Sequence, residues 1–350
     1  MGAIDAIAQL SSKESTYEAL HQECSFGDYL EMVGEQPAIA TLAYQRLYNM
    51  VLAYGTEKYT HNRKTVIHYN FFDDPFGKVD TIYGLDEPLM GFVKMLESGA
   101  NRLGVERRVL LLHGPVSSAK STIVRLLKKG LERYSASDEG RLYGLTWVNT
   151  KDEARVECPM HEEPLRVIPQ ELRASVFEQL GLGGKVIVEG DLCPPCRFIF
   201  RQLMEEYRGD LCRVLEHVVA KRLLLSEKDR IGIGTFVPRD EKNQDSTELT
   251  GDINYRKIAV YGSEADPRAF DFTGELNVAN RGLVEFIEIY KLDVAFLYEL
   301  LSATQEKKIK PKRFPQVDVD LVIIAHTNEP DWLKMIANES MEALRSRTLK

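Results

Sequence analysis

Apolar residues along this chain fall into two patterns, short unbroken runs and longer stretches with helical spacing. Residues 109–112 are apolar at every position, which is typical of a strand buried on both faces of a parallel sheet. Two later runs, residues 283–287 and 318–325, also indicate strands. Helical spacing follows the first run over residues 123–129 and separates the later two over residues 294–305. The pattern predicts an α/β fold around a parallel central sheet.

The loop after the first strand has the sequence of a phosphate-binding loop. It opens with Gly114, ends in Lys120 and Ser121, and leads into a helix, so backbone N–H groups and the helix N-terminus would face an anion. Lys120 would reach the β- and γ-phosphates of ATP, and the Ser121 hydroxyl would hold Mg²⁺. The usual pattern has glycine at Ala119, whose Cβ narrows the range of φ and crowds the phosphates. A degenerate loop that keeps the fold and binds nothing is the alternative. The candidate ATP-binding residues are Gly114, Pro115, Val116, Ser117, Ser118, Ala119, Lys120, Ser121 and Thr122.

The N-terminal part of the chain has mainly helical spacing. We therefore expect residues 1–60 to form a small helical subdomain packed on the main domain, residues 61–350. Within the main domain, residues 142–149 indicate a second strand, expected near the strand that precedes the loop. Residues 232–238 indicate an extended loop or an edge strand.

The composition narrows the class of protein. The 350 residues are 44% hydrophobic and 28% charged, which is typical of globular proteins. The net charge of −8 argues against duplex nucleic acid as a partner, because its binding depends on clustered positive charge. No run reaches the ~18 apolar residues of a membrane span, and residues 1–13 lack the layout of a signal peptide. Five cysteines without an export signal predict a protein of the reducing cytoplasm.

Two short motifs predict a metal site. Cys158 and His161 are three positions apart, as are Cys193 and Cys196, and two side chains at this spacing can converge on one ion. Three thiolates and one imidazole are a ligand set for closed, tetrahedral Zn²⁺. We therefore predict a zinc-knuckle insertion over residues 151–200, in which the metal is structural. Two alternatives are a redox pair of Cys193 and Cys196 with His161 incidental, and buried thiols that bind no metal.

Candidate catalytic residues follow two of the later strands. Glu288 comes after the run 283–287, where a carboxylate can serve the Mg²⁺ ion and the attacking water. Asn328 follows the run 318–325, and its amide could orient that water. Each feature alone is generic. The ordered set of a phosphate loop, a strand that ends in an acid and a strand that ends in asparagine is more specific.

Seven stretches together match a known family. They are residues 114–122, 158–165, 232–236, 244–251, 274–282, 301–306 and 325–329. In these stretches the chain resembles the AAA+ domain of the PrkA family, bacterial proteins usually called serine protein kinases. The resemblance implies a P-loop NTPase of the AAA+ class: a three-layer sandwich with a parallel central sheet, an N-terminal helical subdomain and the zinc-knuckle insertion.

The resemblance also implies roles for single residues. Lys120 and Ser121 match the Walker A ligands of ATP and Mg²⁺, Glu288 matches the acidic residue that closes Walker B, and Asn328 matches sensor 1.

The resemblance also concerns Ile287 and Arg347. Ile287 stands where many relatives outside PrkA have the aspartate that binds Mg²⁺, and Glu285 is a candidate substitute. Arg347, preferred over Arg345, matches the arginine finger, which in AAA+ rings acts on the γ-phosphate of the neighbouring subunit. A homo-oligomer is therefore expected.

The function predicted from the resemblance is an ATP-binding AAA+ domain that hydrolyses ATP and belongs to a bacterial serine/threonine protein kinase of stress or nutrient signalling. PrkA proteins are much longer than 350 residues, so their C-terminal, kinase-like region is expected to be absent from this chain. Because the chain has no motif set of the eukaryotic kinases, kinase activity rests on the resemblance alone. The alternatives are a non-catalytic scaffold that senses nucleotide, and an ATP-driven remodelling or protease-like machine acting on a protein substrate.

Overall fold

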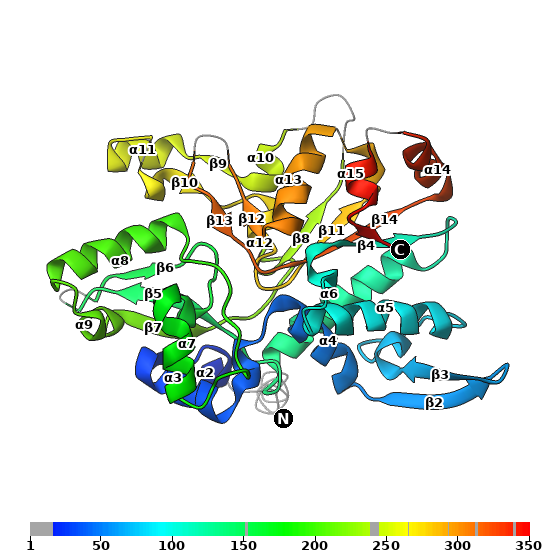
Figure 1. The fold of residues 1–350 in the computed structure, drawn as a ribbon, viewed down its shortest axis with the longest axis horizontal. Helices are drawn as coiled ribbons and strands as arrows, with labels where there is room; N and C mark the ends of the chain where they lie inside the picture. The colour runs from blue at the N-terminus through cyan, green and yellow to red at the C-terminus, as the bar shows by residue number, and fades with distance from the viewer. Residues whose placement is uncertain are drawn as a thin grey trace, which may run out of the picture.

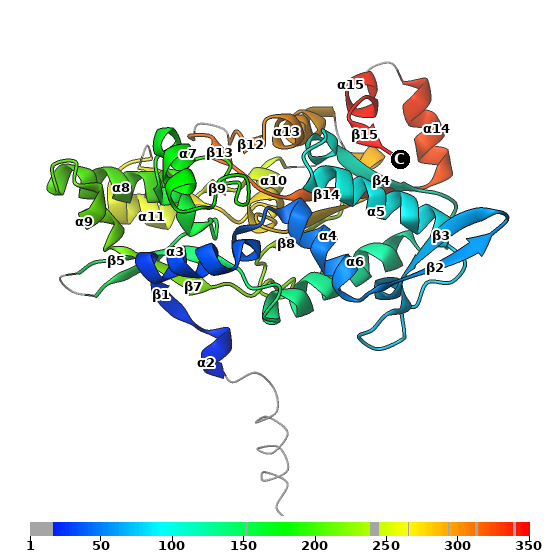
Figure 2. The same ribbon diagram turned by 60° about the horizontal axis from the view of Figure 1, so that its bottom comes forward.

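The computed structural model describes residues 17–150, 153–238, 245–264, 266–292, 294–311, 314–338 and 341–350. Figures 1 and 2 show two parts side by side, a body built on a parallel sheet and a smaller lobe. In these residue ranges no helix is long and apolar enough to cross a membrane.

The body contains a five-stranded parallel sheet. Its strands lie in the order β15, β4, β14, β11, β8. Their bounds are β4 Val109–His113, β8 Ile233–Phe236, β11 Leu283–Ile287, β14 Val322–Thr327 and β15 Thr348–Leu349. The runs 109–112 and 283–287 lie in this sheet, and the run 318–325 contributes its last four residues to β14, while Asp318 belongs to β13 in another sheet. Residues 233–236 form an edge strand, as predicted.

Helices cover both faces of the sheet. Alternate residues of each strand point to opposite faces, and apolar residues on both faces are buried under helices. Leu110 and Ile324 pack in one buried cluster, with residues of α4, α5 and α6. Leu111 and Phe286 pack in a second cluster, with residues of α10, α12, α13 and α14. The bounds are α4 Ala43–Ala53, α5 Asp86–Ala100, α6 Lys120–Ala136, α10 Thr247–Thr250, α12 Glu275–Val278, α13 Val294–Gln305 and α14 Glu329–Ala337. The predicted three-layer α/β sandwich is confirmed.

The smaller lobe is built on an antiparallel sheet with the strand order β1, β7, β5, β6. Its strands are β1 Glu23–Ser25, β5 Tyr143–Val148, β6 Arg155–Glu157 and β7 Val218–Arg222, and its helices are α3 Phe26–Glu35, α7 Gln170–Gln179, α8 Pro194–Glu206 and α9 Leu211–Leu215. We call this part the cysteine lobe. The strand predicted at residues 142–149 exists, but its expected place near β4 is wrong, since β5 pairs with β6 and β7 instead.

The helices predicted for residues 1–60 are present in the described part, which starts at residue 17, and they pack in different places. In α3, the Tyr29 ring lies 5.5 Å from that of Tyr143 in the cysteine lobe. In α4, Leu47 and Met50 belong to the cluster under α5 and α6. The remaining elements are α2 Tyr17–Leu20, the hairpin β2 Thr56–His61 and β3 Lys64–Tyr69, β9 Asp252–Ile253, α11 Tyr255–Tyr261, β10 Phe270–Asp271, β12 Lys308–Ile309, β13 Val317–Asp318 and α15 Glu342–Arg345.

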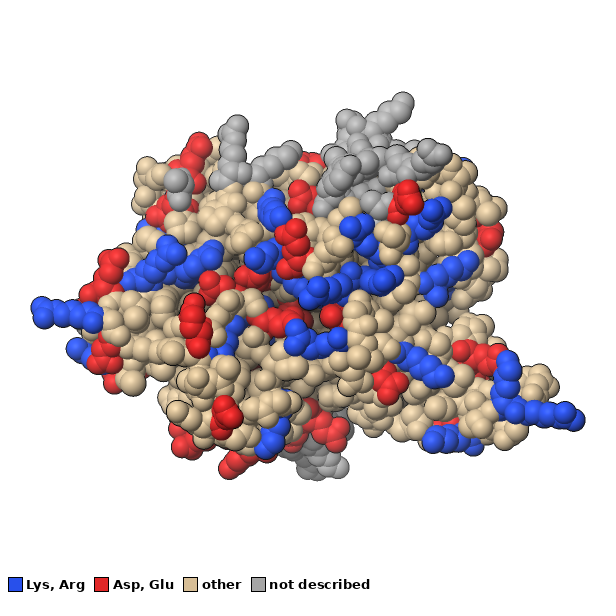
Figure 3. All heavy atoms as spheres, viewed as in Figure 1, with Lys and Arg blue, Asp and Glu red and all other residues tan. Residues whose placement is uncertain are grey.

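A polar cleft of about 490 Å³ separates the lobe from the body. Its walls carry Arg166 and Arg173 on the lobe side and Glu106 and Lys307 on the body side. Figure 3 shows acidic and basic side chains together across the middle of this face, where the two parts meet. An ion pair between Arg102 and Glu189 joins the two parts.

Candidate functional site

The phosphate-loop candidate connects the carboxyl end of β4 to the first turn of α6. Two non-glycine residues of the loop adopt left-handed backbone, Ser117 with φ 66° and Ala119 with φ 60°. Ala119 therefore adopts a backbone conformation that glycine favours, and it carries strain that glycine would avoid. Ser121 follows in the first helical turn, and it is exposed. Its hydroxyl is accessible to a metal ion.

The Lys120 ammonium is bound to the loop itself. Nζ donates to the carbonyl oxygens of Gly114 at 2.8 Å and Pro115 at 2.6 Å, and to Ser118 Oγ at 3.0 Å. Partial burial lowers the pKa of Lys120 below its usual range. Since an ammonium gains more from a phosphate oxygen than from a neutral carbonyl, this side chain is set to exchange partners when an anion arrives.

An apolar cavity of about 420 Å³ adjoins the loop. It is bounded by Leu89 and Phe92 of α5, by Leu112 of β4, and by Gly114 and Lys120. A volume of this size, apolar with a cation at one end, suits a planar base attached to phosphates.

Glu288 and Asn328 lie at the same edge of the sheet as this loop. In β14, which lies between β4 and β11, Thr327 pairs with His113 and His326 pairs with Ile287. Gly114, Asn328 and Glu288 therefore each follow the carboxyl end of one of three adjacent strands. With neighbouring strands about 4.8 Å apart, the three backbone positions span roughly 10 Å.

Local contacts orient these two side chains. Glu288 has left-handed backbone, φ 52°, and its carboxylate pairs with Lys291. Asn328 caps α14, where its side-chain oxygen accepts the Asp331 N–H at 3.0 Å. That bond uses the carbonyl of the Asn328 amide, so the NH₂ group is the part able to donate to a water or a phosphate.

Glu285, the candidate substitute for the metal-binding aspartate, has partners inside the body. Its carboxylate lies 2.6 Å from Lys128 Nζ and 3.2 Å from His326 Nε2, with only 7% of the side chain exposed. Burial raises the pKa of Glu285, but the hydrogen bond with His326 and the charge of Lys128 together lower it below its usual range. Both carboxylate oxygens already have partners inside the body.

Arg347 lies at the amino ends of the strands, on the side of the sheet opposite the phosphate loop. It precedes β15, and its carbonyl accepts the N–H of Val109 at 3.0 Å, at the amino end of β4. The five residues of β4 then separate this position from Gly114 by roughly 16 Å of strand. Arg347 is thus remote from the loop of its own chain.

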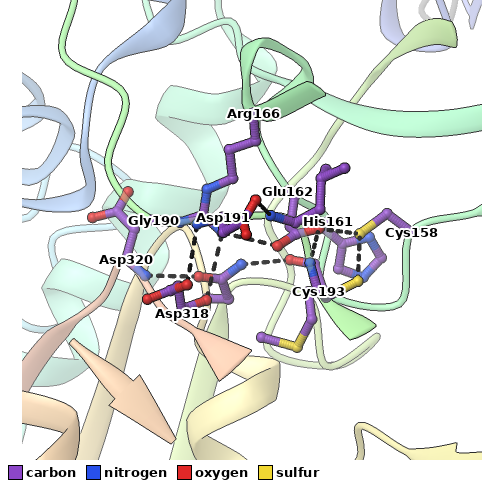
Figure 4. A network of polar contacts seen from close by, with 12 residues as sticks. Cys158, His161, Glu162, Arg166, Gly190, Asp191, Cys193, Asp318 and Asp320 are labelled. Atoms are coloured by element: carbon purple, nitrogen blue, oxygen red, sulfur yellow. Dashed lines mark hydrogen bonds and ion pairs between the residues drawn. The ribbon is translucent and has the colours of Figure 1, made fainter. Parts of the chain in front are cut away.

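The cysteine lobe brings three of the four predicted metal ligands together. Ligand atoms of Cys158, Glu162, Cys193 and Cys196 all lie within 4.8 Å of one another, and all four residues are buried. Figure 4 shows Cys158, Glu162 and Cys193 close together. The sulfur atoms of Cys158 and Cys193 are 3.7 Å apart, close to the edge of about 3.8 Å that two Zn–S bonds of 2.3 Å give at a tetrahedral angle. The fourth residue of this group is Glu162 in place of the predicted His161.

Glu162 joins the cysteines to the polar cleft. Its Oε2 accepts the Cys158 thiol at 3.2 Å and the Cys193 N–H at 3.0 Å, while its Oε1 accepts Arg166 at 2.9 Å. Burial, with the charge of Cys158 adding to it, raises the pKa of Glu162 to about 8. His161 has left-handed backbone, φ 47°, which turns the chain between Cys158 and Glu162.

Asn280 and Arg281, just before β11, link this lobe to the sheet, and no role was predicted for either residue. The Asn280 amide donates to the Met160 carbonyl at 2.6 Å, and its oxygen accepts the Asp320 N–H at 2.8 Å. The Arg281 guanidinium lies 2.8 Å from Glu163. Both residues lie in the stretch 274–282 matched to the family, and that match was the signal available in the sequence.

A second missed contact joins two sides of the candidate site. His113, the last residue of β4, lies 2.7 Å from Glu329, the residue after Asn328. The His113 ring also lies 5.1 Å from that of Trp332 in α14. These contacts fix the start of the loop relative to Asn328.

Comparisons with known proteins identify the family of this chain. A family model described as the PrkA AAA domain matches residues 24–350. The ATP-dependent protease PrkA of Bacillus subtilis (strain 168) is 41% identical over 347 residues, which cover 99% of this chain and 50% of the relative. The serine/threonine kinase YeaG of Escherichia coli (strain K12) is 27% identical over 273 residues, which cover 77% of this chain and 38% of the relative.

These relatives are longer than the chain, which spans about half of the first and less of the second. Among solved structures, the complex of the BchI and BchD subunits of magnesium chelatase aligns with a TM-score of 0.34 and 16% identity, over 69% of this chain and 51% of that one. That score is too low to support a conclusion.

Proposed function

Because this chain belongs to the PrkA AAA domain family, we propose that it binds ATP and hydrolyses it at the carboxyl edge of its parallel sheet. The observation that carries the proposal is the strand register, which brings the loop after β4, Asn328 after β14 and Glu288 after β11 to one edge. Carboxyl ends of strands in open α/β sheets are where such ligands bind.

Each group has a role that its chemistry supports. Loop N–H groups and Lys120 would bind the phosphates, while the apolar cavity under α5 would take the base. Mg²⁺ would neutralise charge on the phosphates, and the exposed Ser121 hydroxyl fits as its protein ligand. Glu288 would accept a proton from the attacking water, and the Asn328 amide would hold that water in line.

We further propose that Arg347 acts on ATP bound to a neighbouring copy. Its position at the amino edge, remote from the loop of its own chain, supports action in trans. A guanidinium stabilises charge on the transferred phosphate, so a homo-oligomer would complete the site.

In the cysteine lobe we propose a structural zinc site formed by Cys158, Glu162, Cys193 and Cys196. The tetrahedral sulfur spacing and the burial of all four side chains support it. Four protein ligands leave no open position, so the metal would stabilise the lobe and take no part in catalysis.

For a protein that carries this domain within the full length of its relatives, which we call the longer protein, we propose ATP-dependent phosphorylation of a protein serine or threonine. The name of the Escherichia coli relative suggests this activity. The Bacillus subtilis relative is named a protease, so proteolysis is the second candidate. Incubating the longer protein with labelled ATP and casein separates the two. Label on casein serine supports the kinase, and ATP-dependent casein fragments without label support the protease.

Isothermal titration calorimetry with ATP tests the binding site itself. We expect the parent chain to bind ATP and Lys120→Ala to bind at least about tenfold more weakly, since a charge-assisted contact is lost. Lys94→Ala, an exposed lysine of α5, is the matched control and should bind like the parent. Equal affinity of Lys120→Ala and the parent would contradict the proposal.

A further inference from the structure

We propose that strand β11 supplies no carboxylate ligand to the Mg²⁺ that accompanies ATP, and that Lys128 of α6 fixes this by holding the strand's one carboxylate inside the body. This inference rests on the ATP binding proposed above and concerns the metal chemistry of the same edge. It separates this chain from P-loop enzymes that hold Mg²⁺ with a strand aspartate.

The position on β11 nearest the phosphate loop is aliphatic. Glu285 contacts Lys128, so Glu285 faces α6. Alternate residues of a strand share a face, so Ile287 faces α6 as well and lies one step closer to the carboxyl edge. Phe286 points the other way and packs against Phe236 and Phe296. An isoleucine side chain offers no oxygen to a cation.

The contact of Glu285 is with a part of α6 well beyond Ser121. Lys128 is seven residues after Ser121 in α6, and at 1.5 Å per residue it lies about 10 Å further along the helix. Two oxygen ligands of one Mg²⁺ lie within roughly 4 Å of each other, because each bond is about 2.1 Å long. The 2.6 Å contact with Lys128 therefore keeps the Glu285 carboxylate out of reach of the metal position.

The buried contacts of Lys128 oppose any swing of Glu285 towards the edge. Lys128 also lies 2.7 Å from Glu227, and its side chain is 7% exposed, as is that of Glu285. Removing Glu285 from this position would leave a buried ammonium with less compensating charge and His326 without its acceptor. The carboxylate is thus part of the packing between α6, β11 and β14.

Glu288 is the acid that directly follows β11, and it lies past the end of that strand. Its carboxylate pairs with Lys291, and its proposed role is to accept a proton from the attacking water. Mg²⁺ would then be held by the Ser121 hydroxyl, the phosphate oxygens and water, an arrangement that this cation accepts readily. No strand carboxylate would repel the triphosphate when the cation is missing, so ATP affinity should depend little on Mg²⁺.

The experiment measures the dissociation constant of ATP in EDTA divided by that in excess Mg²⁺. For the parent chain we expect a ratio below about 3, and for Ile287→Asp a ratio at least about tenfold higher, because its carboxylate both repels free triphosphate and binds the cation. In Ile287→Asn the new side chain has nearly the shape of aspartate without its charge. The ratio of the two dissociation constants should then stay close to that of the parent.

The parent chain alone decides the inference if Ile287→Asp fails to fold. A parental ratio of about ten or more would overturn it, because a protein carboxylate would then hold the metal. Glu285→Gln should leave the ratio unchanged, and a collapse of the ratio in that variant would overturn the inference by identifying Glu285 as the ligand. If the parent binds no ATP in either buffer, the proposed function fails instead, and the two failures stay distinguishable.

Discussion

The Arg281 guanidinium lies 2.8 Å from the Glu163 carboxylate, and the two side chains are only 2% and 9% exposed. Arg281 stands two residues before β11, which leads to Glu288, and Glu163 stands next to Glu162 in the cysteine cluster. This ion pair, with Asn280 beside it, joins the proposed catalytic strand to the proposed metal site. It makes the position of β11 depend on the cysteine lobe.

Breaking this pair should strongly destabilise the fold. Arg281→Met leaves Glu163 buried with the hydrogen bond from Tyr29 but without its ion-pair partner, and breaking a buried pair costs about 3–5 kcal/mol in proteins. Urea denaturation measures the free energy of unfolding. Arg230→Met removes a pair with Glu275 in which the arginine is about half exposed to solvent, and it should cost less than about 1 kcal/mol. An equal decrease in the free energy of unfolding in the two variants would contradict this prediction, because the buried pair would then stabilise the fold no more than the pair of Arg230 and Glu275.

Metal analysis decides the ligands of the cysteine lobe. We expect about one zinc per chain in the parent, as in other four-ligand sites, and loss of zinc with a lower melting temperature in Cys193→Ser and Glu162→Gln. Cys212→Ser, an exposed cysteine, and His161→Ala should both keep the metal. Zinc retained in Glu162→Gln and lost in His161→Ala would restore the ligand set predicted from the motif. A parent without stoichiometric zinc would end the proposal.

Glycine at residue 119 should stabilise the protein. Ala119 has φ 60°, where a side chain costs about 1–2 kcal/mol, partly offset by the greater freedom of glycine in the unfolded chain. Ala119→Gly should therefore raise the free energy of unfolding by roughly 0.5–1 kcal/mol. Ala174→Gly, at an exposed position within α7, should lower it by about the same amount. A loss in both variants would mean that the left-handed loop is not populated in solution.

A histidine between two carboxylates should make stability depend on pH. His68 in β3 lies 2.9 Å from Asp73 and 2.7 Å from Asp86, the first residue of α5. The hydrogen bond with Asp73, supported by that with Asp86, raises the pKa of His68 above its usual value, against an opposing effect of burial. A raised pKa in the folded state means that this stabilisation is complete below about pH 6.5 and is lost as the pH rises through the folded value.

His68→Gln should therefore lose more stability relative to the parent at about pH 5.5 than at about pH 9. His61→Gln, an exposed histidine in β2 of the same hairpin, is the control and should show no such difference. Denaturation of the three proteins at both values checks the sign, and a larger loss at the high pH would contradict the account.

The sequence predicts best what local patterns determine. The phosphate loop needed only an apolar run, a loop and a helix, and all three are found at residues 109–136. Strand partners are harder, because pairing is decided between distant segments. Residues 143–148 have the composition of a strand, but nothing local shows that they pair with β7, some seventy positions later.

For a similar reason, the sequence motif and the structure indicate different residues as the fourth candidate metal ligand. Spacing favours His161, three positions after Cys158, as in a compact knuckle. The left-handed turn at His161 and the buried Arg166 instead bring Glu162 to the thiols, and neither feature is visible in a motif. The roles of Asn280 and Arg281 likewise depend on partners about 120 positions away.

ATP hydrolysis by Glu288→Gln, measured together with ATP binding, tests the central claim most directly. The account predicts that this variant binds ATP as the parent does, while turnover falls by about 10²–10⁴-fold because the base is lost. Lys120→Ala should lose both binding and turnover. Parental turnover in Glu288→Gln would contradict the account, since the edge formed by β4, β14 and β11 would then not be where ATP is hydrolysed.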